Sequence, residues 1–191
     1  IFTVSEFAKD GIIKLCSNFI LNIPLIRVVY NSSSLDIKKS RELKKDKMIL
    51  AVSGSSAQKN TKVILKALEF AKENSLIGWT FVIVGMDKQY SRIYKSGALL
   101  KVYSYLDSSE IAYFYNQSYG LVFPSYYESF GIPLVEAMLN ECQIIASSRG
   151  ATKEVCKKHA FYFDPSDPIE LSRKFEELNK MYPKKPLVSQ S

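Results

Sequence analysis

Residues 124–138 read Pro124-Ser125-Tyr126-Tyr127-Glu128-Ser129-Phe130-Gly131-Ile132-Pro133-Leu134-Val135-Glu136-Ala137-Met138, a pattern typical of a strand end, a loop with one acid, and a helix start with a second. Gly131 allows a close backbone approach to a ligand, and Pro133 suits the first helical position. A helix N-terminus attracts anions through its free N–H groups and its dipole. Two carboxylates, Glu128 and Glu136, beside such an anion site suit a ligand with hydroxyls on both sides of its phosphates. A nucleotide sugar fits that description.

Strands and helices alternate on both sides of this stretch. Apolar periodicity predicts strands at 48–52, 79–84, 99–105, 119–123, 143–146 and 160–163, and helices at 61–73, 109–117, 132–140 and 167–180. The strands are nearly continuous apolar runs, as in a sheet that is covered on both faces. The alternation therefore predicts an α/β fold with a doubly wound parallel sheet.

The chain divides into four parts by composition. We interpret residues 1–30 as the remnant of a preceding domain with a crossing strand, 31–47 as a charged, exposed linker, 48–180 as the main domain, and 181–191 as a loose tail. The chain starts in a strand-like segment without an initiator Met or a signal pattern, so we interpret it as a fragment whose N-terminal part is missing.

Composition narrows the functional classes. The 191 residues are 47% hydrophobic and 13% aromatic, which is typical of a globular protein, and no apolar run reaches membrane-spanning length. The net charge of +7 is compatible with nucleic acid, an anionic membrane face or phosphorylated ligands, and equally with solubility alone. A basic stripe interleaved with aromatics is absent from the sequence, which argues against nucleic acid.

The metal-ligating residue types are sparse. Cys16, Cys142 and Cys156 form no CxxC pair, and His159 is the single histidine. A structural zinc site is therefore not expected, and the cysteines are interpreted as buried, reduced thiols. His159 follows two lysines and is interpreted as a surface residue.

A candidate site follows from the expected sheet. Ligands of such sheets bind at the carboxyl ends of the strands, which brings Gly54, Lys59, Glu128, Gly131 and Glu136 to one rim. A lysine and a helix N-terminus can neutralise a diphosphate, and a carboxylate can accept two hydrogen bonds from a ribose diol. Each residue alone also has a plainer interpretation. Glu136 complements the helix dipole, Lys59 is a surface charge, and two glutamates at this spacing occur by chance.

The complete string 124–138 resembles the donor-site signature of retaining glycosyltransferases of family 4, which have the GT-B fold. Segments 3–7, 28–31, 54–60, 81–85 and 147–154 are similar to further parts of that family. The resemblance implies transfer of a sugar from a nucleotide donor with retention at the anomeric carbon. It also implies that this chain is the C-terminal, donor-binding half, and that the N-terminal acceptor domain is missing.

The resemblance implies a role for each matching position. Glu136 binds the ribose hydroxyls, Glu128 contacts the donor sugar, and Lys59 stabilises the departing phosphate, so Glu128 and Lys59 are the catalytic candidates. The complete donor-binding set is Gly54, Ser55, Lys59, Asn60, Tyr103, Leu106, Glu128, Ser129, Phe130, Gly131, Ile132 and Glu136. Within it, the segment from Tyr103 to Leu106 meets the base. No metal or cofactor is expected.

The sequence also departs from the family. An arginine is usual where this chain has Ser55, and Arg149 is a hypothetical substitute. The helix that usually packs back on the first domain has no evident equivalent in residues 181–191.

The expected reaction is transfer from a UDP-, GDP- or ADP-sugar to a carbohydrate or lipid-linked acceptor. It is expected in the cytoplasm, with peripheral contact at the inner membrane face, and the fragment alone is expected to be inactive. The alternatives are a non-catalytic nucleotide-sugar-binding module, another GT-B enzyme such as an epimerase or a phosphorylase, and an unrelated doubly wound domain. The sequence does not support the last alternative, because it contains neither the glycine-rich dinucleotide-binding motif nor the P-loop motif.

Overall fold

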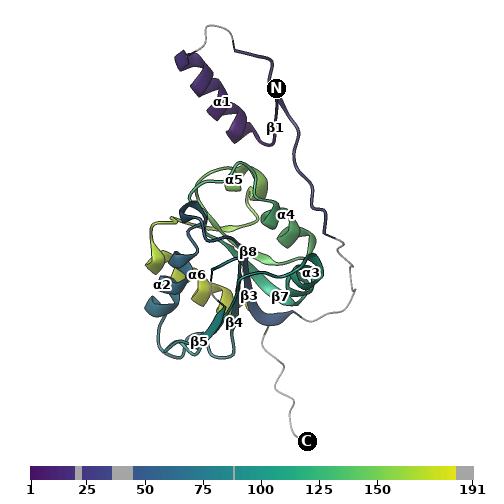
Figure 1. Cartoon of the computed structure of the whole chain (residues 1–191). Helices are drawn as coiled ribbons and strands as arrows, with labels where there is room; N and C mark the ends of the chain where they lie inside the picture. Colours follow the sequence, from purple (N-terminus) through teal and green to yellow (C-terminus); the bar gives the residue numbers. More distant parts are fainter. Residues whose placement is uncertain (20–22, 36–44, 88, 184–191) are drawn as a thin grey trace, which may run out of the picture.

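The structure is a computed structural model that describes residues 1–19, 23–35, 45–87 and 89–183 (Figure 1). Within these residues the main sheet has seven strands in the order β5-β6-β4-β3-β7-β8-β9. The strands are β3 Asp46–Val52, β4 Thr80–Val84, β5 Tyr90–Ile93, β6 Leu99–Tyr103, β7 Ser118–Phe123, β8 Gln143–Ser147 and β9 Phe161–Phe163. The edge strand β5 pairs antiparallel with β6, and the other pairings are parallel. The predicted α/β fold with a parallel sheet is confirmed, with an antiparallel edge added.

Helices cover both faces of the sheet. The helices are α2 Lys62–Phe70, α3 Ser108–Gln117, α4 Ile132–Leu139, α5 Thr152–Cys156 and α6 Pro168–Met181, with a 3₁₀ turn η1 at Ala57–Lys59. Successive strand side chains point to opposite faces. Phe81 therefore packs with α2 and α6, where its ring lies 4.8 Å from that of Phe175, whereas Val82 belongs to the core under α3 and α4. Each face of the sheet has its own apolar core.

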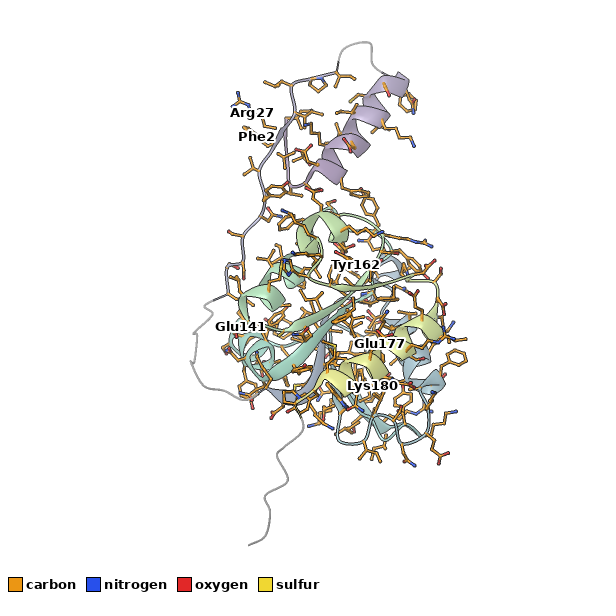
Figure 2. All side chains as sticks on the ribbon, turned by 180° about the vertical axis from the view of Figure 1, so that it is seen from behind. Phe2, Arg27, Glu141, Tyr162, Glu177 and Lys180 are labelled. Atoms are coloured by element: carbon orange, nitrogen blue, oxygen red, sulfur yellow. The ribbon has the colours of Figure 1, made fainter. Side chains whose placement is uncertain are left out.

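A small N-terminal unit precedes the main sheet and comprises the described part of residues 1–30. It contains β1 Phe2–Thr3, α1 Glu6–Phe19 and β2 Arg27–Val28, and β1 and β2 pair parallel. Figure 1 shows this unit beyond α5, outside the layers of the main domain. In Figure 2, Phe2 and Arg27 lie side by side on it, well apart from Tyr162 and Glu177 of the main domain. The unit has a separate sheet and does not extend the main one.

The structure differs from the sequence prediction at several elements. Strand β5 and helix α5 were not predicted, because all four β5 residues are exposed and α5 is little more than one turn. Helix α2 ends at Phe70, since Ala71 takes an extended conformation. Strand β3 begins at Asp46, inside the expected linker 31–47, and residues 36–44 of that linker lie outside the described residues.

The first two residues of the expected tail are ordered, because Met181 ends α6 and Tyr182 packs on the main domain. The Tyr182 ring lies 5.6 Å from that of Trp79, and its hydroxyl donates to the Lys45 carbonyl at 2.6 Å. Residues 184–191 of the tail lie outside the described residues. None of the described helices is both long and apolar enough to cross a membrane.

Candidate functional site

Two loops meet at the carboxyl ends of β3 and β7, where the strand order reverses direction. The β3 loop comprises residues 53–60, and the β7 loop comprises residues 124–131. The Tyr126 amide donates to the Gln58 carbonyl at 2.8 Å, and Asn60 Nδ2 donates to the Pro124 carbonyl at 3.1 Å. A reversal of strand order opens a crevice in doubly wound sheets. The structure therefore places the predicted rim between these two loops.

Lys59 and Glu128 form an ion pair across the two loops. The distance from Lys59 Nζ to Glu128 Oε1 is 2.6 Å, and the side chains are 30% and 15% exposed. Lys59 ends the turn η1, and Asn60 follows it in a left-handed conformation. A half-buried pair of this kind offers a donor for an anion and an acceptor for hydroxyls, and such charge-assisted bonds are strong. Both predicted catalytic residues thus lie in direct contact.

Two glycines shape the loops around this pair. Gly131 precedes α4 with φ +97°, and a Cβ there would lie 2.9 Å from Leu134 Cδ1. Gly131 has no side chain to cap α4, Pro133 has no N–H, and the Leu134 amide donates to the Gly131 carbonyl at 3.0 Å. The Ile132 amide is therefore the group at the helix start that a ligand can use. Gly85 also has φ +97°, and a Cβ there would lie 2.3 Å from the Ser53 carbonyl oxygen. Only glycine fits behind the β3 loop.

Glu136 lies in the second turn of α4 and is 8% exposed. Ser33 Oγ, from the segment that leaves the N-terminal unit, donates to Glu136 Oε1 at 3.1 Å. On the inner side is Tyr115, whose pKa is raised well above its usual value by burial and by the nearby Glu136 charge. The contact with Ser33 was missed from sequence, because Ser32-Ser33-Ser34 signals only a connector.

The expected base-contacting segment is only partly available. Leu106 is 7% exposed and belongs to the core, so only its backbone can meet a ligand. Tyr103 is half-buried, and its ring lies 5.7 Å from that of Phe114. Between them, Tyr105 is 79% exposed, which makes it the accessible aromatic side chain of this segment.

The rest of the predicted set falls into two groups. Gly54 and Ser55 line a cavity of about 270 Å³, whose other walls include Thr61, Met86 and Asp87. Asn60 lines the same cavity. Its Nδ2 also donates to the Pro165 carbonyl at 2.7 Å, so this side chain joins three loops. The sequence analysis assigns Asn60 to donor binding, and the loop contacts are an additional role that it did not predict.

Ser129, Phe130 and Ile132 frame the start of α4. Phe130 is 7% exposed, and its ring lies 5.9 Å from that of Tyr30, whereas Ser129 and Ile132 are exposed. The backbone amides of this segment, rather than the Phe130 side chain, are therefore the groups that a ligand can use.

Arg149, the hypothetical substitute for the arginine missing at Ser55, is engaged elsewhere. Its guanidinium donates to Asp164 Oδ1 at 3.1 Å and lies 5.7 Å from the centre of the Tyr126 ring. Among the described residues, no group of three or more His, Cys, Asp or Glu side chains has the arrangement of a metal site. The three cysteines are buried, as expected, and none is in a disulfide. Burial raises the pKa of Cys142 and Cys156 to about 11.

Comparison with known proteins identifies the family. Residues 32–187 match the family of glycosyl transferases group 1. The chain belongs to this family. It is 28% identical over 172 residues to the O-antigen chain mannosyltransferase RfbU of Salmonella typhimurium, covering 87% of this chain and 47% of that protein. It is 22% identical over 192 residues to the O-antigen chain mannosyltransferase B of Escherichia coli, covering 90% and 49%.

Solved glycosyltransferase structures share the fold of this group 1 domain. A glycosyltransferase from Rickettsia africae matches with a TM-score of 0.70 and 18% identity, covering 94% of this chain and 53% of that one. Anabaena HepE in complex with UDP-glucose matches with a TM-score of 0.68 and 16% identity, covering 92% and 52%. The chain spans about half the length of the curated mannosyltransferases named above.

Proposed function

We propose that this chain is the nucleotide-sugar-binding half of a glycosyltransferase that transfers a hexose with retention and without a metal ion. The observation that carries the proposal is the Lys59–Glu128 pair, 2.6 Å apart beside the uncapped start of α4. Cation, carboxylate and helix amides are the groups that a sugar diphosphate requires. Glu136 in the same helix adds a second carboxylate for the ribose.

The chemistry follows from where charge develops. As the bond from sugar to diphosphate breaks, negative charge grows on the leaving phosphate, and fixed donors aimed at it lower the barrier. Lys59 and the amides at Gly131 and Ile132 supply such donors, and losing one costs about 3–4 kcal/mol in comparable sites. Glu128 accepts from the sugar hydroxyls, and Glu136 accepts from the ribose diol in place of Ser33. The leaving phosphate can act as the base for attack on the same face.

The relatives favour a class of donor and acceptor. Both mannosyltransferases are named for the O-antigen chain, and HepE is described in complex with UDP-glucose. We therefore propose a mannosyl or other hexosyl donor on UDP, GDP or ADP, and a growing polysaccharide or lipid-linked glycan as the acceptor. The proposed contacts with the base are the backbone of Leu106 and the ring of Tyr105.

The acceptor side is proposed to pack on the N-terminal unit. This unit exposes a set of large apolar side chains, namely Ile1, Phe2, Leu15, Phe19, Ile23 and Leu25. A face of this kind indicates an interaction surface. An acceptor domain that covers it would complete the cleft, so we expect the isolated chain to bind donor but not to transfer sugar. The net charge of +7 favours a location on the cytoplasmic face of an anionic membrane.

A non-catalytic module that only binds nucleotide sugar is the second candidate. It is favoured by Ser55, which is exposed on the β3 loop, and by Arg149, which Asp164 engages. The clamp on the diphosphate then has one cation fewer than the family usually provides. Sugar transfer by a chain that includes an acceptor domain would exclude this candidate.

Calorimetric titration without metal tests the donor site. The ligands are UDP, GDP and ADP, their glucose conjugates and GDP-mannose, each titrated into the wild-type chain and into Glu136→Ala and Lys59→Ala. Lys66→Ala, an exposed lysine on α2, is the matched control. We expect one nucleotide class to bind, and each site variant to lose roughly ten-fold or more in affinity. Absence of binding to a folded wild-type chain, or equal effects in the control, would overturn the donor-site proposal.

A further inference from the structure

The start of α1 in the N-terminal unit is capped by a side chain of the main domain. The amides of Glu6 and Phe7 donate to Glu154 Oε1 and Oε2 at 2.8 and 3.0 Å. Amides at a helix start have no partner within the helix, so a carboxylate there is favourable in both hydrogen bonding and charge. Burial raises the pKa of Glu154, but hydrogen bonds from these amides and from Tyr30 outweigh it and lower the pKa overall. Glu154 is therefore an anion that two backbone amides of α1 hold in place, one on each of its oxygens.

The same helix start also contacts the β7 loop. Ser5 is fully buried, and its hydroxyl donates to the Ser129 carbonyl at 2.5 Å while accepting from the Ala8 amide at 3.0 Å. Phe7 packs on Tyr127 with ring centres 5.4 Å apart. Helix α1 thus touches the loop on either side of Glu128.

A third contact joins the turn before α5, the helix that carries Glu154, to the backbone of Glu128. Helix α5, which carries Glu154, follows Gly150 and Ala151, and the Ala151 amide donates to the Glu128 carbonyl at 3.1 Å. Gly150 has φ +70°, and a Cβ there would lie 3.0 Å from both the backbone nitrogen and oxygen of Glu128. The backbone of Glu128 is therefore enclosed between α1 and the turn that leads into α5.

We propose that Glu154 is a positioning residue that fixes the β7 loop, and with it Glu128, to the N-terminal unit. The proposal rests on the proposed donor site and adds a route by which movement of the N-terminal unit reaches that site. The path runs from the α1 amides through Glu154 and α5 to the Glu128 carbonyl, and in parallel through Ser5 to Ser129. Docking of α1 then aligns Glu128 with Lys59. Displacing α1 therefore weakens the contact between Glu128 and the sugar more than it weakens the contacts with the nucleotide.

Calorimetry on the 191-residue chain separates the two effects. The affinities of UDP and UDP-glucose, and of GDP and GDP-mannose, are measured for wild type, Glu154→Ala and Glu154→Gln. For Glu154→Ala we expect the dissociation constant of the nucleotide sugar to rise roughly ten-fold, and that of the nucleoside diphosphate to change less than about two-fold. Glu154→Gln keeps one acceptor oxygen and is expected to fall between. Equal losses for both ligands would overturn the proposal, since they indicate general damage to the fold.

Hydrogen exchange provides an independent readout. In Glu154→Ala we expect faster exchange at residues 6–7 and also at residues 127–130. The matched control is Glu176→Ala, because Glu176 accepts from the Lys72 amide at 3.1 Å in the same way, between α6 and the end of α2. It should leave residues 127–130 unchanged. If no nucleotide binds wild type, the proposed function fails. Exchange at residues 127–130 still shows whether Glu154 is coupled to the β7 loop. Faster exchange confined to residues 6–7 would refute it.

Discussion

The N-terminal unit and the main domain bury their apolar residues very differently. In the main domain, Phe81, Phe175 and Leu178 are at most 1% exposed between the sheet and its helices. In the N-terminal unit, Phe2 is 74% exposed and Phe19 is 81% exposed, and one pair of two-residue strands supports a single helix. The main domain carries its own core. The N-terminal unit is held by polar and aromatic contacts with the β7 loop and by hydrogen bonds to Glu154.

This contrast assigns different tasks to the two regions. A domain with two apolar cores can hold its loops rigid, and rigid loops give a precise site. A small unit without a core of its own is free to move with whatever covers its apolar face. The segment through Ser33, which joins the unit to β3, also contacts Glu136. The N-terminal unit therefore contacts the loop that carries Glu128, and the joining segment contacts the Glu136 carboxylate.

The largest expected difference is between two phenylalanines. Phe175→Ala removes a buried ring from the main core and should lower the free energy of unfolding by about 3–5 kcal/mol. Phe19→Ala removes an exposed ring and should change it by less than about 0.5 kcal/mol. Urea denaturation followed by far-ultraviolet circular dichroism measures both. A loss of more than 2 kcal/mol for Phe19→Ala would mean that its ring is buried in solution, which would contradict the difference in apolar burial between the two regions.

A pair of glycines gives the next largest effect. Gly85→Ala forces a Cβ to within 2.3 Å of the Ser53 carbonyl oxygen at a positive φ. We expect a loss of about 3 kcal/mol and a displaced β3 loop. Gly11→Ala in α1 meets nothing within 4 Å and should stabilise that helix by about 0.5–1 kcal/mol. Thermal unfolding tests both, and a Gly85→Ala protein as stable as wild type contradicts the close approach.

Thiol labelling compares the regions without mutation. The pKa of Cys142 and Cys156 is about 11, against an ordinary value of 9.0, so their reactive thiolate at pH 8 is scarcer by about 100-fold. Cys16 lies in α1, in the region that we expect to open more readily. Mass spectrometry after brief alkylation should find Cys16 labelled first, and labelling of Cys142 should keep rising up to about pH 11. In urea the three should react alike. If Cys142 of the folded protein is labelled as fast as Cys16, the N-terminal unit does not open more readily than the main domain.

The smallest expected effect concerns the joining segment. Ser33 occupies one oxygen of Glu136 that the ribose is proposed to use. Ser33→Ala removes that competitor and should tighten nucleoside diphosphate binding by roughly three-fold, since a hydrogen bond contributes about 1 kcal/mol net. Ser34→Ala, one residue along, is the calorimetric control. Weaker binding by Ser33→Ala would show that Ser33 supports Glu136 and does not compete with the ribose.

Much of the main domain could be predicted because its signals are local. The parallel strands are apolar runs, and Asp167-Pro168 marks a helix start, where the Asp167 carboxylate accepts from the first amides of α6. Strand β5 could not be predicted, because its four exposed residues have no buried face and its order comes from pairing with β6. Within the candidate site, the sequence analysis named Glu128 from the 124–138 motif and Lys59 from the loop after the first predicted strand of the main domain. Ser5, Ser33 and Glu154 were not, because their partners are over 100 residues away in the chain.

The sequence by itself determined the α/β class, and it predicted the rim and the two carboxylates on either side of a helix start. These depend on residue spacing, turn glycines and strand patterns, all of which act over a few residues. Only the tertiary structure decided that Lys59 pairs with Glu128, that Asn60 fastens loops, and that Glu154 caps a helix of another unit. The physical reason is that a hydrogen bond or an ion pair depends on distances of about 3 Å, and only the folded chain sets such distances between remote residues.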